Sequence, residues 1–380
     1  MASDWQVATL GELVAFKTGK LDSNAAVPNG AYPFFTCSQE TLRTGSYSFD
    51  TECVLLAGNN ANGIFPLKYF RGKFDAYQRT YVVTPRDPDR LMTRFLYYAL
   101  RPKLSEFRSV STGAATKFLT LTILNQTEIQ VPPLRVQRRI VGILSAYDDL
   151  IEHNLRRIKI LDEMTRAFYR EWFVEFRFPG NVEGFVGADG APSGWRQDTL
   201  KDIAVLVMGQ SPKSEFYNSE GRGLPFHQGV SNFGDYFPTD RTYCTVDDRL
   251  AEEDDILFSV RAPVGRINIA QRRMVIGRGL SAIRSLTGHQ VFLLEQLRDL
   301  FKEEDSIGGG TIFKAVSKQD MENIKIMTPT ETLREQFEAV ARPAWKQMRV
   351  LTNIVTNLRS QRDLLLSRLI SGQIEFGEAA

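Results

Sequence analysis

The sequence predicts an α+β protein made of two similar domains and a pair of long helices. Three observations support this fold class. Segments near the N-terminus recur about 190 residues later, each copy alternates short β-rich runs with a helical segment, and each copy ends in a long stretch with helical periodicity. A chain of 380 residues is also long enough for two or three domains.

The repeat opens with WQVATLGEL at residues 5–13 and WRQDTLKDI at residues 195–203. The later matches are YPFF with LPFH, ECVLLAGNNANGI with DDILFSVRAPVGRI, and TGAATKFLTLTILNQTEIQV with IGGGTIFKAVSKQDMENIKI. The matched positions include Trp5 with Trp195, Leu10 with Leu200, Gly19 with Gly209, Thr116 with Thr311, and Ile129 with Ile324. Two copies of so long a unit indicate a tandem duplication, since a solenoid needs at least three short repeats. The shared Trp and Leu positions are expected to pack into the core of each copy.

The expected boundaries are 1–133 and 195–330 for the globular domains, 134–177 and 331–373 for a central and a distal helix, and 178–194 for a linker rich in glycine and proline. About 40 residues of helix form a rod of roughly 60 Å. A rod with one narrow apolar stripe needs a partner, so an antiparallel two-helix coiled coil is favoured. The alternative is that each helix covers only its own domain.

Local signals set the expected ends of the distal helix. Thr332 and Glu335 have the spacing of a capping box, and Ser371-Gly372 is a plausible stop. Pro343 lies inside the segment and is expected to kink the helix or to start a new one.

The helix entry VPPLRVQRRIVGILSAYDDLIEHN and the terminal LLLSRLISGQIEF resemble the specificity subunits of type I restriction-modification systems. The resemblance covers essentially the whole chain. It depends on the run Pro133, Leu134, Gln137 and Ile140 and on the terminal segment 369–372. In the second copy, Leu333 and Gln336 match this run, but Pro133 has no direct counterpart.

The resemblance implies a subunit without catalytic activity. Each target-recognition domain would read one half of a split site in double-stranded DNA, and the helix pair would set the spacing. Two methyltransferase subunits would dock on the helices, and restriction subunits would complete the complex. No cofactor is expected on this chain, because S-adenosylmethionine and ATP would bind the partner subunits.

Composition is compatible with this function. A net charge of +2 is too small for binding that depends on phosphate neutralisation alone, so DNA contacts would be local or shared with a partner. Three scattered cysteines fit a reducing cytoplasm. No apolar run is long enough to span a membrane, and the N-terminal residues do not resemble a signal peptide. A cytoplasmic location is therefore expected.

The motifs of the relevant enzymes are not found. The single Pro-Pro, in VPPL, lacks the acid or amide and the aromatic residue of an adenine methyltransferase motif. GRGLSA, at residues 277–282, has glycine spacing but precedes a β-like run, and no phosphate-binding loop for ATP is present. The competing hypotheses are a single-chain DNA methyltransferase or nuclease with a duplicated recognition region, and a structural protein that binds only other proteins.

Polar loops supply the candidate DNA-binding residues, because amide, hydroxyl and guanidinium groups recognise base edges. The candidates in the first domain are Asn59, Asn60, Asn62, Gln78, Arg79, Thr116 and Lys117. Those in the second domain are Ser259, Arg261, Arg266, Arg278, Thr311 and Lys314. The alternative for the Asn-Gly loop is that these residues serve left-handed turn geometry. Gly308 to Gly310 fit either a close approach to phosphate or a flexible loop.

The central helix carries interleaved charges. Its basic residues are Arg135, Arg138, Arg139, Arg156, Arg157 and Lys159, and its acidic residues are Asp148, Asp149, Glu152, Asp162 and Glu163. This pattern fits a solvated face or a docking surface for the partner subunit.

Overall fold

The structure, a computed structural model, describes residues 5–61, 63–113, 116–181, 183–188, 190–302, 306–307, 311–312 and 315–374. Contacts divide the chain into two units. Unit 1 comprises Met1–His153 and Val355–Ala380, and unit 2 comprises Asn154–Ile354. Each unit therefore holds one copy of the repeat and part of both long helices, whereas the expected boundaries give each helix a segment of its own.

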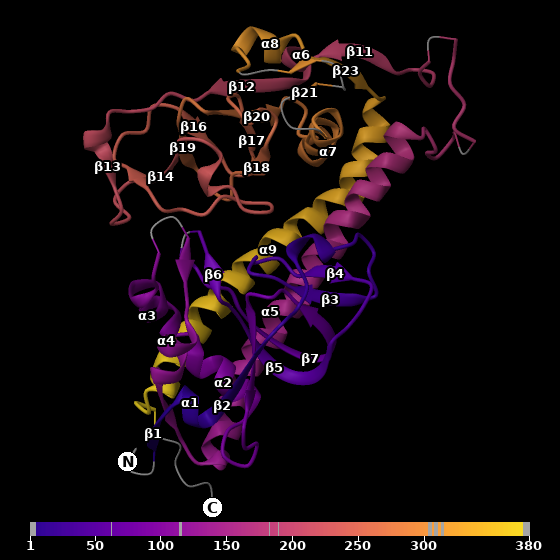
Figure 1. Cartoon of the computed structure of the whole chain (residues 1–380). Helices are drawn as coiled ribbons and strands as arrows, with labels where there is room; N and C mark the ends of the chain where they lie inside the picture. The colour runs from indigo at the N-terminus through magenta and orange to yellow at the C-terminus, as the bar shows by residue number, and fades with distance from the viewer. Residues whose placement is uncertain are drawn as a thin grey trace, which may run out of the picture. The chain divides into compact units, whose positions relative to one another are not determined.

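Unit 1 is built on a six-stranded sheet in the order β2-β8-β5-β7-β3-β4 (Figure 1). Its strands are β2 (Val14–Thr18), β3 (Tyr32–Phe35), β4 (Leu42–Thr44), β5 (Phe49–Ala57), β7 (Leu67–Ala76) and β8 (Thr80–Pro85). All neighbours are antiparallel except β3 and β7, which are parallel. Two short ribbons pair β1 (Gln6–Thr9) with β10 (Glu128–Val131), and β6 (Asn59–Asn60) with β9 (Lys117–Phe118).

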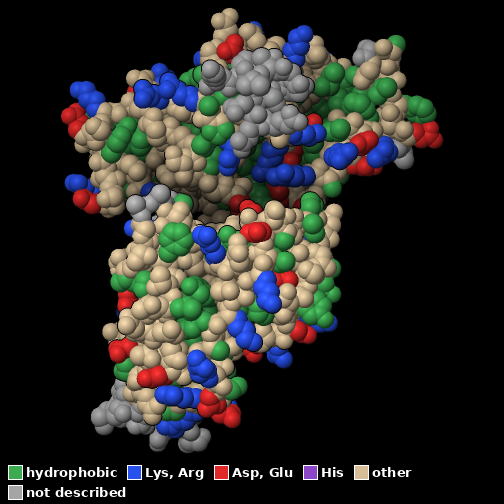
Figure 2. All heavy atoms as spheres, viewed as in Figure 1, with side chains coloured by type: hydrophobic (Ala, Val, Ile, Leu, Met, Phe, Trp, Pro, Cys, Tyr) green, Lys and Arg blue, Asp and Glu red, His purple; other side chains and the backbone are tan. Residues whose placement is uncertain are grey.

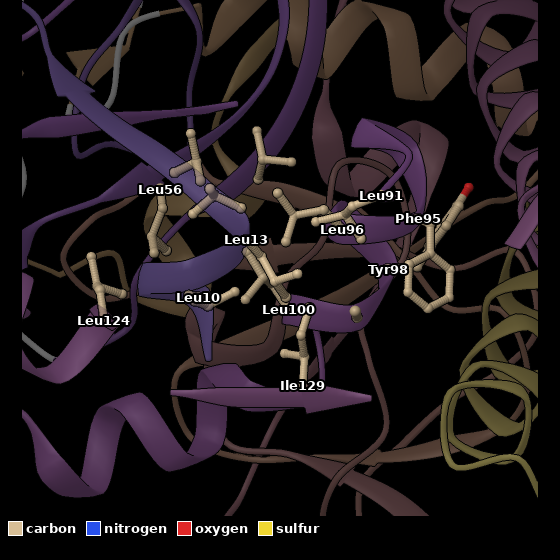
Figure 3. Close-up of a cluster of buried hydrophobic side chains, with 14 of the residues drawn as sticks. Leu10, Leu13, Leu56, Leu91, Phe95, Leu96, Tyr98, Leu100, Leu124 and Ile129 are labelled. Atoms are coloured by element: carbon tan, nitrogen blue, oxygen red, sulfur yellow. The ribbon is translucent and has the colours of Figure 1, made fainter. Parts of the chain in front are cut away.

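Unit 1 also has five short helices in its described residues, of which α1 and α2 pack against this sheet. They are α1 (Leu10–Leu13), η2 (Ser23–Ala25), α2 (Thr93–Leu100), α3 (Lys103–Val110) and α4 (Leu121–Gln126). Leu10 and Leu13 of α1 lie in one buried cluster with Leu56 of β5 and Phe95 of α2 (Figure 3). Trp5 packs against this cluster while remaining partly exposed. The expectation that the opening segment supplies core side chains is confirmed.

Unit 2 divides its strands between two larger sheets. The first has the order β12-β20-β17-β18 and the second the order β13-β15-β14-β19-β16 (Figure 1). The strands are β12 (Ala204–Met208), β13 (Tyr217–Asn218), β14 (Leu224–His227), β15 (Tyr243–Cys244), β16 (Leu250–Ala251), β17 (Ile256–Ser259), β18 (Ile267–Ile269), β19 (Met274–Ile276) and β20 (Leu280–Ser285). Two ribbons pair β11 (Arg196–Thr199) with β23 (Lys325–Thr328), and β21 (Ser306–Ile307) with β22 (Thr311–Ile312). The short helices are η4 (Ser214–Phe216), η5 (Val230–Asn232), α6 (Leu200–Ile203), α7 (Gln290–Leu300) and α8 (Lys318–Glu322).

Strand register corrects one part of the repeat alignment. Ala8 pairs with Ile129 in unit 1, and its counterpart Asp198 pairs with Ile326 in unit 2. Ile129 therefore corresponds to Ile326, and its match with Ile324 is wrong by two residues. A shift of two residues keeps every side chain of a strand on the same face, so the hydrophobic pattern could not reveal the error.

Both long helices are present. α5 spans Leu134–Tyr169 and continues as a π-helical turn, η3, over Arg170–Val174. α9 spans Glu331–Ile370. In the described part of the chain, no helix is both long and apolar enough to cross a membrane.

The ends of α9 differ partly from expectation. Thr332 lies inside the helix, so the predicted cap at that residue is wrong. Pro343 also lies inside it and does not start a new helix; Pro343 is exposed, so the carbonyl groups that it leaves without a donor can be hydrated. Gly372 has a φ of 69°, which confirms the predicted stop.

The helices pair in an antiparallel sense within each unit. In unit 1, Ile140 and Leu144 of α5 share a buried cluster with Leu366 and Leu369 near the end of α9. In unit 2, Phe168 near the end of α5 stacks on Phe337 near the start of α9, with ring centroids 5.1 Å apart. The predicted fold, with two α+β repeats and an antiparallel helix pair, is confirmed.

A buried polar side chain anchors the entry of each long helix. Gln137, the fourth residue of α5, is fully buried and accepts a hydrogen bond from the backbone N–H of Met92 at 2.9 Å. Arg334, the fourth residue of α9, is also buried and donates to Thr287 Oγ1 at 3.2 Å. Met92 and Thr287 both lie just before a helix of their repeat. Arg334 is thus the counterpart of Gln137, and the match with Gln336, which is exposed, is wrong.

Candidate nucleic-acid interface

Three segments of unit 1 meet just after β5. The Gly58 N–H donates to the Arg79 carbonyl at 2.8 Å, and the Leu119 N–H donates to the Gly58 carbonyl at 2.8 Å. The β6–β9 ribbon follows at once, pairing Asn59 with Phe118 and Asn60 with Lys117. We call this arrangement the reader frame. It brings together four predicted DNA-binding residues, which are Asn59, Asn60, Arg79 and Lys117.

The reader frame of unit 1 orients its polar side chains by specific contacts. Asn59 is half-buried, and its Oδ1 accepts a hydrogen bond from the Cys37 thiol at 3.0 Å. Arg79 is exposed, and its guanidinium lies 5.7 Å from the centroid of the Phe118 ring, within the range of a cation–π interaction. These contacts limit the directions in which both groups can point.

The other predicted residues of unit 1 lie beside the frame. Gln78 is exposed in the turn between β7 and β8 and donates to Asp22 Oδ1 at 2.7 Å. Thr116 directly precedes β9 and is half-buried. Asn62 lies outside the described residues.

Unit 2 contains the same reader frame. The Val260 N–H donates to the Gly279 carbonyl at 3.0 Å, and the Val316 N–H donates to the Val260 carbonyl at 2.9 Å. Arg261 then forms an antiparallel bridge with Ala315. Val260 therefore corresponds to Gly58. It follows that Arg261 corresponds to Asn59 and that Arg278 corresponds to Gln78.

Among the described residues of this second frame, the exposed cations are arginines. Arg261, Arg266 and Arg278 all have exposed side chains. The backbone N–H of Arg278 donates to Ser211 Oγ at 3.3 Å, which holds its turn against the end of β12. Arginine recognises guanine through two parallel hydrogen bonds, whereas asparagine and glutamine suit adenine. The two frames thus present different polar side chains from one backbone arrangement.

Ser259 is a correction to the predicted set. Its side chain is 1% exposed, so it cannot contact a base edge in this conformation. Its hydroxyl donates to the Pro263 carbonyl at 2.7 Å and accepts from the Arg266 N–H at 2.8 Å. Ser259 therefore shapes the loop that carries Arg261.

The structure does not describe the side chains of the remaining predicted residues of unit 2. Thr311 lies in β22, where only the backbone is described. Lys314 and Gly308 to Gly310 lie outside the described residues.

Sequence reasoning missed several residues at or near the frames. Cys37, two residues after β3, and Phe118, in β9, reach the unit 1 frame from separate segments, while Arg249 and Lys318 line a hollow beside the unit 2 frame. No local motif marks these residues. Only the strand register, which joins segments that are distant in sequence, brings them to the site.

The charges are distributed as the low net charge suggests. On the face shown in Figure 2, Lys and Arg side chains are interspersed with Asp and Glu, and they do not cover either unit as a continuous basic surface. No cluster of three or more His, Cys, Asp and Glu side chains that could hold a metal ion is found among the described residues.

Several acids of α5 are used within their own unit. Asp148 accepts a hydrogen bond from Arg362 at 2.7 Å, and Asp162 accepts one from Arg298 at 3.0 Å. The helices also expose large apolar side chains, which are Ile143, Leu150, Leu155, Ile160 and Met164 on α5 and Val340, Val350, Ile354 and Leu364 on α9.

Known proteins are similar to this chain in sequence and in fold. The sequence matches the family model of the type I restriction modification DNA specificity domain twice, at residues 2–161 and 192–340. The MjaX specificity subunit named for a type I restriction enzyme of Methanocaldococcus jannaschii is 31% identical over 296 residues, which cover 74% of this chain and 68% of that protein. The type I restriction enzyme EcoDI specificity subunit of Escherichia coli is 35% identical over 179 residues, 47% of this chain and 39% of that protein. The crystal structure of a type I restriction-modification system S subunit from M. genitalium has the same fold, with a TM-score of 0.65, 20% identity and coverage of 96% of each chain.

Proposed function

Because the chain belongs to the family of type I restriction-modification DNA specificity proteins, we propose that it is the sequence-specific DNA-recognition subunit of such a complex. The globular part of each unit reads one half of a bipartite site in double-stranded DNA. The chain is non-catalytic, and the chemistry belongs to its partners. It acts in the cytoplasm, where chromosomal and incoming DNA are accessible.

One observation carries this proposal. The two reader frames have the same backbone hydrogen bonds but present different side chains at equivalent positions. Asn59 in unit 1 corresponds to Arg261 in unit 2. A duplicated scaffold with changed polar groups is what recognition of two different half-sites requires, since base identity is read by the pattern of donors and acceptors.

The helices suit a spacing function. Half-sites read from one side of a duplex lie roughly 34 Å apart, about one helical turn of DNA. At 1.5 Å per residue, α5 and α9 have lengths of roughly 54 and 60 Å. Helices of this length are sufficient to fix such a spacing, and the insertion of one helical turn would change it by about 5.4 Å.

The partners follow from the same assignment. Two methyltransferase subunits dock on the helices, and restriction subunits join the full complex; S-adenosylmethionine and ATP bind these partners. The exposed apolar side chains of both helices support the docking. Ile143 and Val340 are each the tenth residue of their helix, are 37% and 60% exposed, and offer an equivalent contact to each methyltransferase copy.

Methylome sequencing of the host with and without the gene tests the function. The expected result is the loss of one bipartite adenine-methylation motif when the gene is deleted, with its return on complementation. An unchanged methylome in a host whose methyltransferase subunit is expressed would contradict the proposal. Transfer of labelled methyl groups to DNA by the purified chain alone would favour the single-chain methyltransferase instead.

A further inference from the structure

Unit 2 contains an open hollow of about 580 Å³ at the end of β12. Three cationic side chains line it, from Arg249, Arg278 and Lys318, together with the segment from Met208 to Ser211. We call it the basic hollow. Its lining includes apolar side chains of β12 as well as cations, so it can accommodate a group with both a carbon skeleton and a negative charge.

The basic hollow adjoins the reader frame of unit 2. Arg278 directly precedes Gly279, whose carbonyl accepts the hydrogen bond from Val260. Lys318 lies three residues after Ala315, which is bridged to Arg261. An anion held in the hollow would therefore lie next to the loop that carries Arg261.

The cations of the hollow are available to a ligand. Over the described ranges, neither Arg249 nor Arg278 forms a salt bridge with a carboxylate, and both side chains are exposed. Lys318 has a carboxylate neighbour, with its Nζ 3.3 Å from Glu322 Oε1. Among the residues that the structure describes, three cations and one carboxylate leave the hollow net positive.

The wall of the hollow is held in place by a close backbone approach and by hydrogen bonds of the Ser211 side chain. A Cβ atom on Gly209 would lie 2.2 Å from the Gly277 carbonyl oxygen, so only glycine allows this approach. Ser211 Oγ donates to Gln228 Oε1 at 2.8 Å while it accepts from the Arg278 N–H. Arg278 therefore projects from a turn that is fixed before any ligand binds.

Unit 1 has the same wall without the charges. A Cβ on Gly19, the counterpart of Gly209, would lie 1.6 Å from the Ala76 carbonyl oxygen. Strand register and helix caps give the counterparts of the three cations, which are Tyr47 for Arg249, Gln78 for Arg278 and Leu121 for Lys318. No position is cationic in unit 1, so the basic hollow is a specific property of unit 2.

We propose that the basic hollow binds one phosphodiester group of the DNA backbone beside the half-site read by unit 2. This inference rests on the proposed DNA-recognition function. Guanidinium groups form paired, charge-assisted hydrogen bonds with phosphate oxygens. Phosphate contacts fix the register of a protein on the duplex without reading sequence. Arg278 is thereby a positioning residue, and Arg261 remains the base-reading candidate.

The test compares two double variants of the full-length chain, bound to its methyltransferase subunits. R249Q/R278Q removes two charges from the basic hollow. K213Q/R222Q removes two exposed charges of the same unit that already pair with Glu215 and Glu220. DNA affinity is measured over a range of salt concentrations on a duplex with the methylome-derived site and on a scrambled duplex.

The hollow variant is expected to bind about 10-fold more weakly on both duplexes and to reduce the slope of log K against log salt by about 1, the value for one lost phosphate contact. Its preference for the correct site over the scrambled one stays unchanged. A slope equal to that of the control variant overturns the proposal, as does a selective loss of sequence preference. If the wild-type complex itself shows no salt-dependent, sequence-preferring binding, the DNA-recognition function fails instead.

Neutral methylphosphonate linkages locate the phosphate. Scanned one at a time through the unit 2 half-site, one linkage should weaken wild-type binding several-fold and leave R249Q/R278Q binding unaffected. The absence of such a linkage contradicts the proposal. Inorganic phosphate titrated without DNA at constant ionic strength should give no saturable heat; saturable binding that requires Arg249 and Arg278 would assign the hollow to a free anion.

Discussion

The thiol of Cys37 donates a hydrogen bond to Oδ1 of Asn59 at 3.0 Å. This contact joins the second residue after β3 to the first residue of β6 within the reader frame of unit 1. Because the carbonyl oxygen of the amide accepts this bond, Nδ2 is the amide atom that does not face the thiol. Cys37 thus selects one of the two orientations of the Asn59 amide.

Replacing Cys37 should weaken recognition of one half-site. Cys37→Ala removes the donor and lets the Asn59 amide rotate, at a cost of about 1 kcal/mol, or roughly fivefold in affinity. Cys37→Ser, which keeps a hydroxyl donor, should retain most of the affinity. Binding to duplexes altered in one half-site at a time distinguishes the two outcomes, and an equal loss at both half-sites would contradict the role of Cys37.

Alkylation gives an independent measurement of the same residue. Burial raises the pKa of the Cys53 thiol to about 12, so it stays protonated at pH 8, and Cys244 is also buried. N-ethylmaleimide should therefore modify Cys37 alone in the folded protein, as mass spectrometry would show, and should reduce DNA binding to the level of Cys37→Ala or below.

Asp148 should contribute strongly to the stability of unit 1. Its carboxylate accepts hydrogen bonds from Arg362 Nη1 and Tyr98 Oη, both at 2.7 Å. Asp148→Ala removes the acceptor of Tyr98 Oη and of Arg362 Nη1, while Arg362 keeps its pair with Asp363, and we expect a loss of about 2 kcal/mol in the free energy of unfolding. Asp149→Ala is the matched control, because its pair with Arg94 is 3.4 Å long and its carboxylate is 58% exposed.

Urea unfolding, followed by circular dichroism, measures both variants. The control should lose less than about 1 kcal/mol, as is usual for an exposed pair. Similar losses for Asp148→Ala and Asp149→Ala would show that the contacts of Asp148 stabilise the protein no more than an exposed ion pair does.

The fold was largely predictable because its determinants are local. The positions of Leu10 and Leu200 follow from a repeated segment, and both side chains are fully buried. The long helices follow from periodic apolar residues. Details that depend on tertiary contacts were not predictable. For example, Arg334 occupies the buried position at the entry of α9 that Gln137 occupies in α5. The sequence instead suggested Gln336, which is the same residue type as Gln137 but is exposed.

The site was predictable only in part, for the same reason. A polar loop could be recognised from composition, which identified Asn59 and Arg261. Composition could not show that the Ser259 hydroxyl is used inside its own loop. It also gave no reason to select Arg249, which reaches the basic hollow through the pairing of β16 with β19.

Unit 2 should lose stability in mild acid through His289. This side chain is 7% exposed, and its Nδ1 lies 2.8 Å from Thr287 Oγ1. Burial, followed by the nearby Arg334 charge, lowers the pKa of His289 below its usual 6.5. As the pH falls through 6.5, the unfolded chain binds a proton that the folded chain does not, so unfolding is favoured.

The expected result is a melting temperature that falls between pH 7.5 and 5.5 and falls less in His289→Gln. His153→Gln is the control, because His153 is exposed. Thermal unfolding followed by tryptophan fluorescence is suitable, since Trp172, Trp195 and Trp345 all belong to unit 2. An identical pH dependence in His289→Gln and wild type would exclude this residue as the cause.

Substitutions at the two equivalent reader positions should affect different halves of the DNA site. Asn59→Ala removes an amide from unit 1, and Arg261→Ala removes a guanidinium from unit 2. A lost two-point contact with a base costs about 1–3 kcal/mol and relaxes the preference at that position alone. Each variant should therefore tolerate other bases in one half-site while the other half-site stays strict. Methylome sequencing of hosts that carry either variant measures both halves at once. Because the frames belong to different units, relaxation of the same half-site by both variants would contradict the division of the recognition sequence between them.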